Sequence, residues 1–313
     1  MSILVVGSVA YDAVSTPGYS RKESLGGSAT FFSLAASYFT PVSIVGVVGD
    51  DFRREDLRML QEHGIDTSGL VKRPGKTFRW VGEYGQDMNE AHTLDTQLNV
   101  FADFQPVLAP EVRQPAYLFL ANIDPDLQQS VIGQLQSWPR LVAGDTMNFW
   151  IQGKAESLSK VIGSVGTLLI NEGELRLLTK EPNLLKAARQ VLRLGPTMLV
   201  VKRGEYGAVC FTENDMFATP AYPLETVVDP TGAGDTFAGG FMGYLAATDD
   251  LSIDNVRRAM IVGSVMASFN VESFGPDRLQ ALTTTAIQDR YRDFWRLTYF
   301  DGTGDRPLPR RKE

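Results

Sequence analysis

Residues 229–235 read Asp-Pro-Thr-Gly-Ala-Gly-Asp, and residues 236–245 continue as Thr-Phe-Ala-Gly-Gly-Phe-Met-Gly-Tyr-Leu, an apolar run that predicts a helix. Small residues ahead of a helix let backbone N–H groups approach a phosphate closely, and the helix dipole favours its charge. Each glycine inside the helix weakens it by about 1 kcal/mol relative to alanine, so close packing is expected. Asp235 stands at the helix start, where it either faces an anion or serves as the N-cap.

Away from this stretch, short apolar runs alternate with longer amphipathic segments, which is typical of βα units. Continuous apolar runs indicate strands that helices cover on both faces. We therefore expect an α/β fold with a doubly wound, mostly parallel sheet. The expected strands are residues 3–6, 42–48, 117–121, 141–143, 167–170, 198–201 and 208–211, and the expected helices are residues 29–39, 53–63, 127–136, 184–194, 236–246, 255–269 and 285–297.

Two segments, residues 12–25 and 77–101, interrupt this alternation with β-favouring residues and turn signals. We expect them to form a small β-structured lid over the carboxyl ends of the main strands, where doubly wound sheets bind ligands. The predicted organisation is one domain over residues 1–300, with these lid segments inserted and a flexible tail over residues 301–313.

The composition excludes several classes of protein. A net charge of -7 over 313 residues argues against a nucleic-acid surface. One cysteine and two histidines exclude an intrachain disulfide and a Cys/His zinc site, and they disfavour a Ser-His hydrolase. The N-terminus lacks a basic signal-peptide region, and no apolar run approaches the roughly 18 residues of a membrane span. We expect a cytoplasmic protein without nucleic-acid or membrane partners.

Three further motifs have both a structural and a functional interpretation. Asp12 is either a turn residue or a ligand for a substrate hydroxyl. Gly26 and Gly27 precede an expected helix, and their structural interpretation is a simple turn before that helix. Asn171 and Glu174 have the spacing of a capping box, which also suits a phosphate site at a helix start.

Taken in order, residues 229–235 and these motifs resemble the pattern of the ribokinase-like (PfkB) carbohydrate kinases, over nearly the whole chain. The resemblance implies a ribokinase-like fold and ATP-dependent phosphorylation of a hydroxyl on a small sugar, polyol or nucleoside. It also implies that the backbone of Gly232, Ala233 and Gly234 forms an anion hole. Asp235 would accept the proton of the substrate hydroxyl.

The resemblance assigns the remaining sites as well. Asp12, Gly26 and Gly27 would hold the substrate, and residues 263–275 would line the adenine and monovalent-cation region. The implied cofactors are ATP, Mg²⁺ held near Glu174 through water, and a monovalent cation such as K⁺. The implied nucleotide-binding residues are Asn171, Lys202, Gly204, Thr231, Gly232 and Gly234.

The sequence also departs from the family. Phe31 stands where many members have an asparagine that contacts the sugar, so the pocket would favour an apolar or aromatic substrate face unless Phe31 faces the core. Residues 145–150 lack the arginine that some sugar-acid kinases supply, which favours a neutral substrate. Asn122 and Asp124 are either hydroxyl ligands or turn residues.

Other functions fit the sequence less well. Residues 7–12 lack the G-x-G-x-x-G pattern of a nicotinamide dehydrogenase. A vitamin-type kinase of the same superfamily often has cysteine in place of Asp235. A non-catalytic sensor of sugar or nucleotide has no need of Asp235 and its glycines. Strand addition at the exposed lid sheet would give a homodimer.

Overall fold

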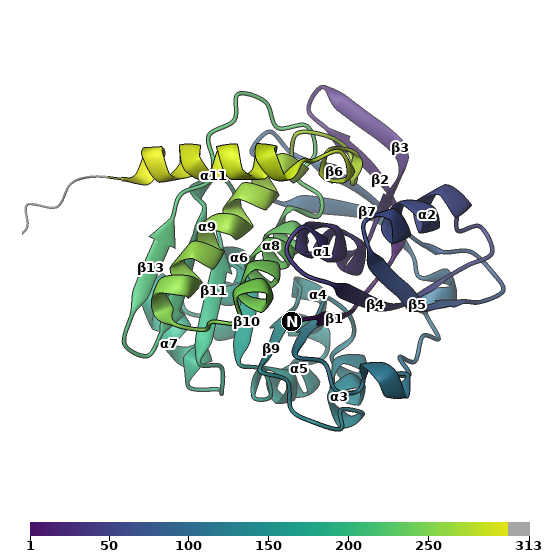
Figure 1. The fold of residues 1–313 in the computed structure, drawn as a ribbon, viewed down its shortest axis with the longest axis horizontal. Helices are drawn as coiled ribbons and strands as arrows, with labels where there is room; N and C mark the ends of the chain where they lie inside the picture. The colour runs from purple at the N-terminus through teal and green to yellow at the C-terminus, as the bar shows by residue number, and fades with distance from the viewer. Residues whose placement is uncertain (300–313) are drawn as a thin grey trace, which may run out of the picture.

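The computed structural model describes residues 1–299, in which the strands form two separate sheets (Figure 1). The larger sheet has the order β13-β12-β11-β10-β9-β8-β1-β4-β5. It is parallel from β5 to β11 and antiparallel at β12 and β13, which confirms the expected mostly parallel architecture. Its strands are β1 (Ile3–Val6), β4 (Val42–Val48), β5 (Ile65–Lys72), β8 (Tyr117–Leu120), β9 (Leu141–Asp145), β10 (Thr167–Asn171), β11 (Met198–Lys202), β12 (Ala208–Thr212) and β13 (Met216–Thr219).

Helices cover both faces of this sheet because alternate residues of its strands are apolar on both sides. In β1, Ile3 and Val5 face one hydrophobic cluster, and Leu4 and Val6 face the other. The first cluster packs against α1 (Ser28–Ser37), α2 (Arg54–Glu62), α8 (Ala233–Thr248) and α9 (Ile253–Asn270), with α10 (Asp277–Gln280) and α11 (Thr284–Thr298) outside them. The second cluster packs against α3 (Pro125–Gly133), α4 (Asn148–Gly153), α5 (Ala155–Ile162), α6 (Glu172–Thr179) and α7 (Leu184–Leu192).

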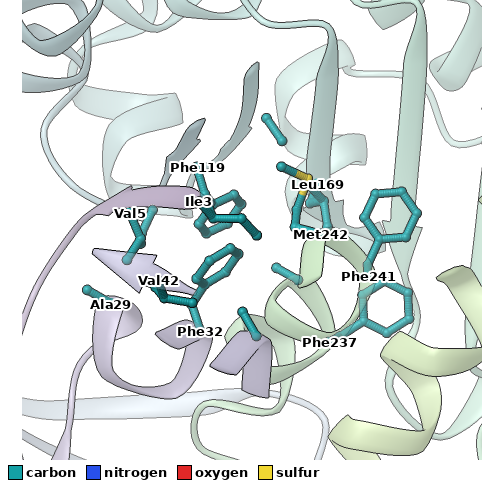
Figure 2. Packing of buried hydrophobic residues seen from close by; sticks show 14 of the residues in the cluster. Ile3, Val5, Ala29, Phe32, Val42, Phe119, Leu169, Phe237, Phe241 and Met242 are labelled. Carbon is teal, nitrogen blue, oxygen red and sulfur yellow. The ribbon is translucent and has the colours of Figure 1, made fainter. Parts of the chain in front are cut away.

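The centre of the first cluster joins α1, α8 and the sheet (Figure 2). Phe32 of α1 stacks on Phe119 of β8, with ring centroids 4.1 Å apart and an interplanar angle of 6°. From α8, Phe237 and Phe241 extend the same apolar layer. This packing holds the start of α8 against the carboxyl half of the sheet.

The glycines of α8 allow this close approach, as the sequence predicted. A methyl group on Gly239 would overlap the carbonyl oxygen of Phe32, and one on Gly243 would lie 2.9 Å from the Cα of Ala36. On the other side, a methyl group on Gly240 would lie 2.9 Å from Met266 of α9. The helix is therefore wedged between two neighbours that leave no room for a side chain.

The smaller sheet has the order β3-β2-β6-β7 and comes from the two segments predicted as a lid. Its strands are β2 (Ala10–Thr16), β3 (Tyr19–Gly26), β6 (Phe78–Tyr84) and β7 (Ala91–Gln97). β2 follows closely on β1, and β3 leads directly into α1, so this sheet adjoins the carboxyl edge of the larger one. The expected tail over residues 301–313 lies outside the described residues.

Some elements differ from expectation. The helix predicted over residues 236–246 begins three residues earlier, at Ala233, because glycine at 232 adopts the left-handed conformation that starts it. β5 and β13, the two edge strands of the larger sheet, were not expected: β5 mixes polar with apolar residues, and β13 has only four residues. Three short 3₁₀ helices complete the chain: η1 (Asn99–Phe101), η2 (Pro110–Val112) and η3 (Gly204–Tyr206). None of the helices in residues 1–299 has the length and apolar character that crossing a membrane requires.

We predict that Gly239→Ala destabilises the protein by about 1–3 kcal/mol, the usual cost of overpacking, because the new methyl group meets backbone atoms of α1. Gly133→Ala, in α3, is the matched control, since a methyl group there has no atom within 4 Å. Chemical denaturation of both variants measures the difference. Equal stability of the two variants would contradict the close packing of α8 on α1.

Candidate functional site

Asp235 occupies the third position of α8 and is not its N-cap, so the N-cap interpretation of Asp235 is wrong. The N-cap is Gly232, with φ of 76°. The N–H of Ala233 donates to the carbonyl of Pro230 at 3.1 Å, whereas in the described residues the N–H groups of Gly232 and Gly234 have no backbone acceptor. Two amides of the predicted anion hole, rather than three, are therefore available to a bound phosphate.

The loop before α8 is held in place from α9. The Oδ1 of Asp229 accepts from the N–H of Thr231 at 2.9 Å, and its Oδ2 accepts from the N–H of Gly275 at 3.5 Å. The Nδ2 of Asn270 donates to the carbonyl of Thr231 at 2.7 Å. The Oδ1 of the same amide lies 3.2 Å from the hydroxyl of Thr236. These contacts fix the Gly-Ala-Gly turn before any ligand binds.

Asp12 lies within strand β2, not in a turn, and its carboxyl group is buried beside Asp235. A methyl group on Gly26 would overlap this carboxyl group, and the N–H of Gly27 donates to it. The pair of glycines therefore makes room for Asp12 as well as starting α1. Burial, and after it the negative charges of Asp229 and Asp235, raise the pKa of Asp12 to about 8.

A second group of charges lies at the ends of β9, β10 and β11. The Nζ of Lys202 lies 2.7 Å from the Oδ2 of Asp145, and both side chains are largely buried. Asn171 and Glu174 form the predicted capping box, with N–H donation to Glu174 Oε2 at 2.9 Å and to Asn171 Oδ1 at 2.8 Å. Burial, and after it repulsion from Asp145, raises the pKa of Glu174 to about 7, while Lys202 opposes the shift.

Lys202 connects these charges to the Gly-Ala-Gly turn. Its side chain is 16% exposed, so it is not a solvated lysine at a strand end. A methyl group on Gly234 would lie 3.0 Å from its Nζ. Burial opposes the charge of Lys202, but Asp145, Glu174 and Asp235 more than offset this and raise its pKa. For Asp235, burial and then Asp145 raise the pKa to about 7, and Lys202 acts in the opposite direction.

A cavity of about 540 Å³, a size typical of small-molecule sites, opens beside the turn. Lys202, Gly204 and Gly234 line it, together with the loop at residues 86–89 between β6 and β7. The segment predicted to line the adenine region, residues 263–275, contributes Ser264, Ala267, Ser268 and Val271.

Three predicted substrate residues have structural contacts instead. Phe31 is 1% exposed and packs in an apolar cluster below Gly232, where a methyl group would overlap its ring. Asn122 accepts from the indole N–H of Trp150 at 3.0 Å. Asp124 caps α3 and pairs with Lys154 at 2.7 Å. These contacts favour the core interpretation of Phe31 and the structural interpretation of Asn122 and Asp124.

The structure adds four residues to the site. Asp145 ends an apolar run and Asp229 begins the quoted motif, so both positions carried a signal in the sequence. Asn270 lies in the segment of residues 263–275 that the resemblance assigned to the adenine and cation region, but it was not singled out there. Tyr84 lies in a lid segment, and its hydroxyl is 3.2 Å from the hydroxyl of Thr231. Burial raises the pKa of Tyr84, and the charges of Asp229, Asp12 and Asp235 add to this.

Solved structures of other proteins have the same fold. A protein assigned as a ribokinase II from E. coli, solved with ATP and Mg²⁺, superposes with a TM-score of 0.77 at 19% identity, covering 93% of this chain and 99% of that one. At this identity the likeness shows the fold.

Curated relatives extend the likeness to the sequence. A cytidine kinase of Thermococcus kodakarensis is 29% identical over 252 residues, covering 78% of this chain and 88% of the relative. An inositol 3-kinase of Arabidopsis thaliana is 23% identical over 299 residues, covering 92% and 78%. The sequence profile of the pfkB family carbohydrate kinases matches residues 2–281. The chain therefore belongs to the pfkB family of carbohydrate kinases.

Proposed function

We propose that this protein transfers the γ-phosphoryl group of ATP to a hydroxyl of a small, neutral sugar, polyol or nucleoside. The observation that carries the proposal is the position of Asp235 between two sites. Asp12 lies on one side of it, and Lys202 with the 540 Å³ cavity lies on the other. An acceptor hydroxyl on the first side and a nucleotide on the second would meet at the Gly-Ala-Gly turn.

On the acceptor side, Asp12 and Asp235 hold the hydroxyl, and Asp235 accepts its proton. A base works best when its pKa lies near the working pH, and burial and Asp145 raise the pKa of Asp235 to about 7. Phosphoryl transfer passes through a loose transition state, so orienting the hydroxyl matters more than the strength of the base.

On the donor side, the N–H groups of Gly232 and Gly234 and the ammonium group of Lys202 face the transferring phosphoryl group. Fixed donors of this kind stabilise charge without reorganising during the reaction. The cavity beside them takes the nucleotide, as its size and its partly apolar lining permit.

Magnesium fits the charges near this turn. Asp145 and Glu174 are buried carboxyl groups that repel one another, and a cation would relieve that repulsion. Within residues 1–299, no three His, Cys, Asp or Glu side chains gather as a metal-binding group, so Mg²⁺ would be held largely by phosphates and water. When bound, Mg²⁺ neutralises phosphate charge. We propose that Glu174 contacts it through water.

The small sheet covers the acceptor side. Tyr84 on β6 reaches Thr231 of the loop before α8, and Asp12 lies on the neighbouring strand β2. A cover of this kind excludes water, which limits wasteful hydrolysis of ATP. The cytidine kinase and the inositol 3-kinase both act on neutral, hydroxyl-rich compounds by their names, which supports a neutral acceptor for this chain.

We predict that Asp235→Asn lowers kcat by about 10²-fold or more, because the amide cannot accept the proton, while nucleotide affinity changes little. ADP formation over a panel of sugars, polyols and nucleosides measures it. Asp124→Asn is the matched control, since that carboxyl group caps α3 and pairs with Lys154. Near-normal kcat in the Asp235 variant would overturn its role. Acceptor binding by the wild-type protein without ADP formation would favour a sensor.

We predict that Glu174→Gln raises the Mg²⁺ concentration needed for half-maximal activity, while thermal stability changes little. Glutamine keeps an oxygen that can accept from the N–H of Asn171, so the capping geometry survives. A magnesium titration of ADP formation, run beside a thermal melt, separates the two effects. Unchanged titration curves together with unchanged kcat would reduce Glu174 to a cap.

We predict that Asp12→Asn raises the melting temperature at pH 8 by about 2–4 °C or more and leaves it nearly unchanged at pH 4. The folded pKa of about 8 exceeds the ordinary value of 3.8, so the folded protein binds this proton more tightly than the unfolded chain. Stability is therefore lost as pH rises from about 4 to about 8, and asparagine removes that loss. Melting curves at both pH values test this; a variant less stable at pH 8 would contradict the burial of an uncompensated charge.

A further inference from the structure

The inner face of the small sheet can be identified from two residues that reach the site. Asp12 of β2 interacts with Asp235, and the hydroxyl of Tyr84 at the end of β6 lies 3.2 Å from that of Thr231. Alternate residues of a strand share a face, so Trp80 and Gly82 lie on the same face as Tyr84. The parallel register of β2 and β6, which places Asp12 opposite Trp80, leads to the same assignment.

The indole ring of Trp80 lies across the backbone of Gly82. A methyl group on Gly82 would overlap the six-membered part of the indole, so the ring occupies the space that a side chain would fill. The indole Nε1–H donates to the hydroxyl of Thr93 on β7 at 3.1 Å. Gly82 is buried while Trp80 stays partly exposed, so the ring rests on the backbone of Gly82 and part of the side chain remains accessible.

No other aromatic ring of the described residues stacks on the indole of Trp80. The ring–ring contacts of residues 1–299 do not include Trp80, although Phe78, two residues earlier, stacks on Phe101. One of the two interpretations of Phe31 made it an aromatic contact for the substrate, but that ring is buried in the core. On the face that carries Asp12, Trp80 and Tyr84 are both partly exposed, and the hydroxyl of Tyr84 is occupied by its contact with Thr231.

We propose that Trp80 determines acceptor specificity, with its indole as a platform on which the planar base of a nucleoside stacks. This inference rests on the proposed kinase function and names the acceptor class. Neighbouring strands lie about 4.8 Å apart, so the platform stands roughly one sugar ring from the carboxyl group of Asp12. A ribose hydroxyl then lies between Asp12 and Asp235 while the base reaches the indole. A free sugar or a cyclic polyol offers only the small C–H face of its ring, so it gains less from contact with the indole than a planar base does.

The first test compares wild type with Trp80→Ala and Trp80→Phe, using ADP formation with cytidine, inosine, ribose and myo-inositol. Stacking of a base on an aromatic side chain corresponds to roughly 5- to 150-fold in affinity. We expect kcat/KM for the nucleosides to fall about 10-fold or more in Trp80→Ala, and less in Trp80→Phe. Activity on ribose should change by less than about 3-fold.

The second test displaces the indole without deleting it. Gly82→Ala should force the ring off its support and reproduce the loss for nucleosides, because the new methyl group takes its place. In a Trp80→Ala background the same substitution should cause no further fall in kcat/KM for the nucleosides. Gly85→Ala is the matched control on the same hairpin, since its methyl group would meet no atom closer than 3.8 Å. Additive losses in the double variant would overturn the platform.

The outcomes separate the two proposals. Preference of the wild-type protein for ribose or inositol over nucleosides, or equal losses for all acceptors in Trp80→Ala, overturns the platform and leaves the kinase intact. Absence of ADP formation with every acceptor overturns the kinase. Calorimetric titration of cytidine into wild type and Trp80→Ala then decides the platform by itself, because binding needs no turnover; unchanged affinity overturns it.

Discussion

The contact between α1 and α8 is the constraint on which the site depends. Along α8, Gly232 lies against Phe31, Gly239 against Phe32 and Gly243 against Ala36, so one helix follows the other from its first turn. The N-cap of α1 is Gly27, beside the carboxyl group of Asp12. The acceptor side and the Gly-Ala-Gly turn are therefore positioned by the same pair of helices, and neither can move far without the other.

The geometry concentrates negative charge in a small volume. Burial and mutual repulsion raise the pKa values of Asp12, Glu174 and Asp235 to between about 7 and about 8. Lys202 offsets part of this repulsion through its contact with Asp145. Such an arrangement lowers the stability of the empty protein near neutral pH, and it favours whatever brings protons or cations to the site. A nucleotide that binds together with Mg²⁺ brings such a cation.

The sequence was sufficient for the fold because its parallel strands are continuous apolar runs and because residues 229–235 carry an unusual concentration of small residues. It was insufficient for Phe31. All residues of α1 from Ser28 to Ala36 are buried, so the helix has no polar face from which the direction of a side chain could be read. The proposed role of Trp80 was missed for a different reason, because it depends on contacts of the indole with Gly82 and with Thr93 on another strand. Contacts between strands of unknown register are not visible in a sequence.

The hairpin of β6 and β7 touches both halves of the site. Tyr84 reaches the loop before α8, while residues 86–89 at its tip line the cavity proposed for the nucleotide, with Asn89 next to Gly204. Any displacement of this hairpin at the cavity would therefore also shift the wall of the proposed acceptor side. Thermodynamic reciprocity then requires that the acceptor change the affinity for the nucleotide by the same factor by which the nucleotide changes the affinity for the acceptor. In such a molecule, the affinity measured for either ligand depends on whether the other ligand is bound.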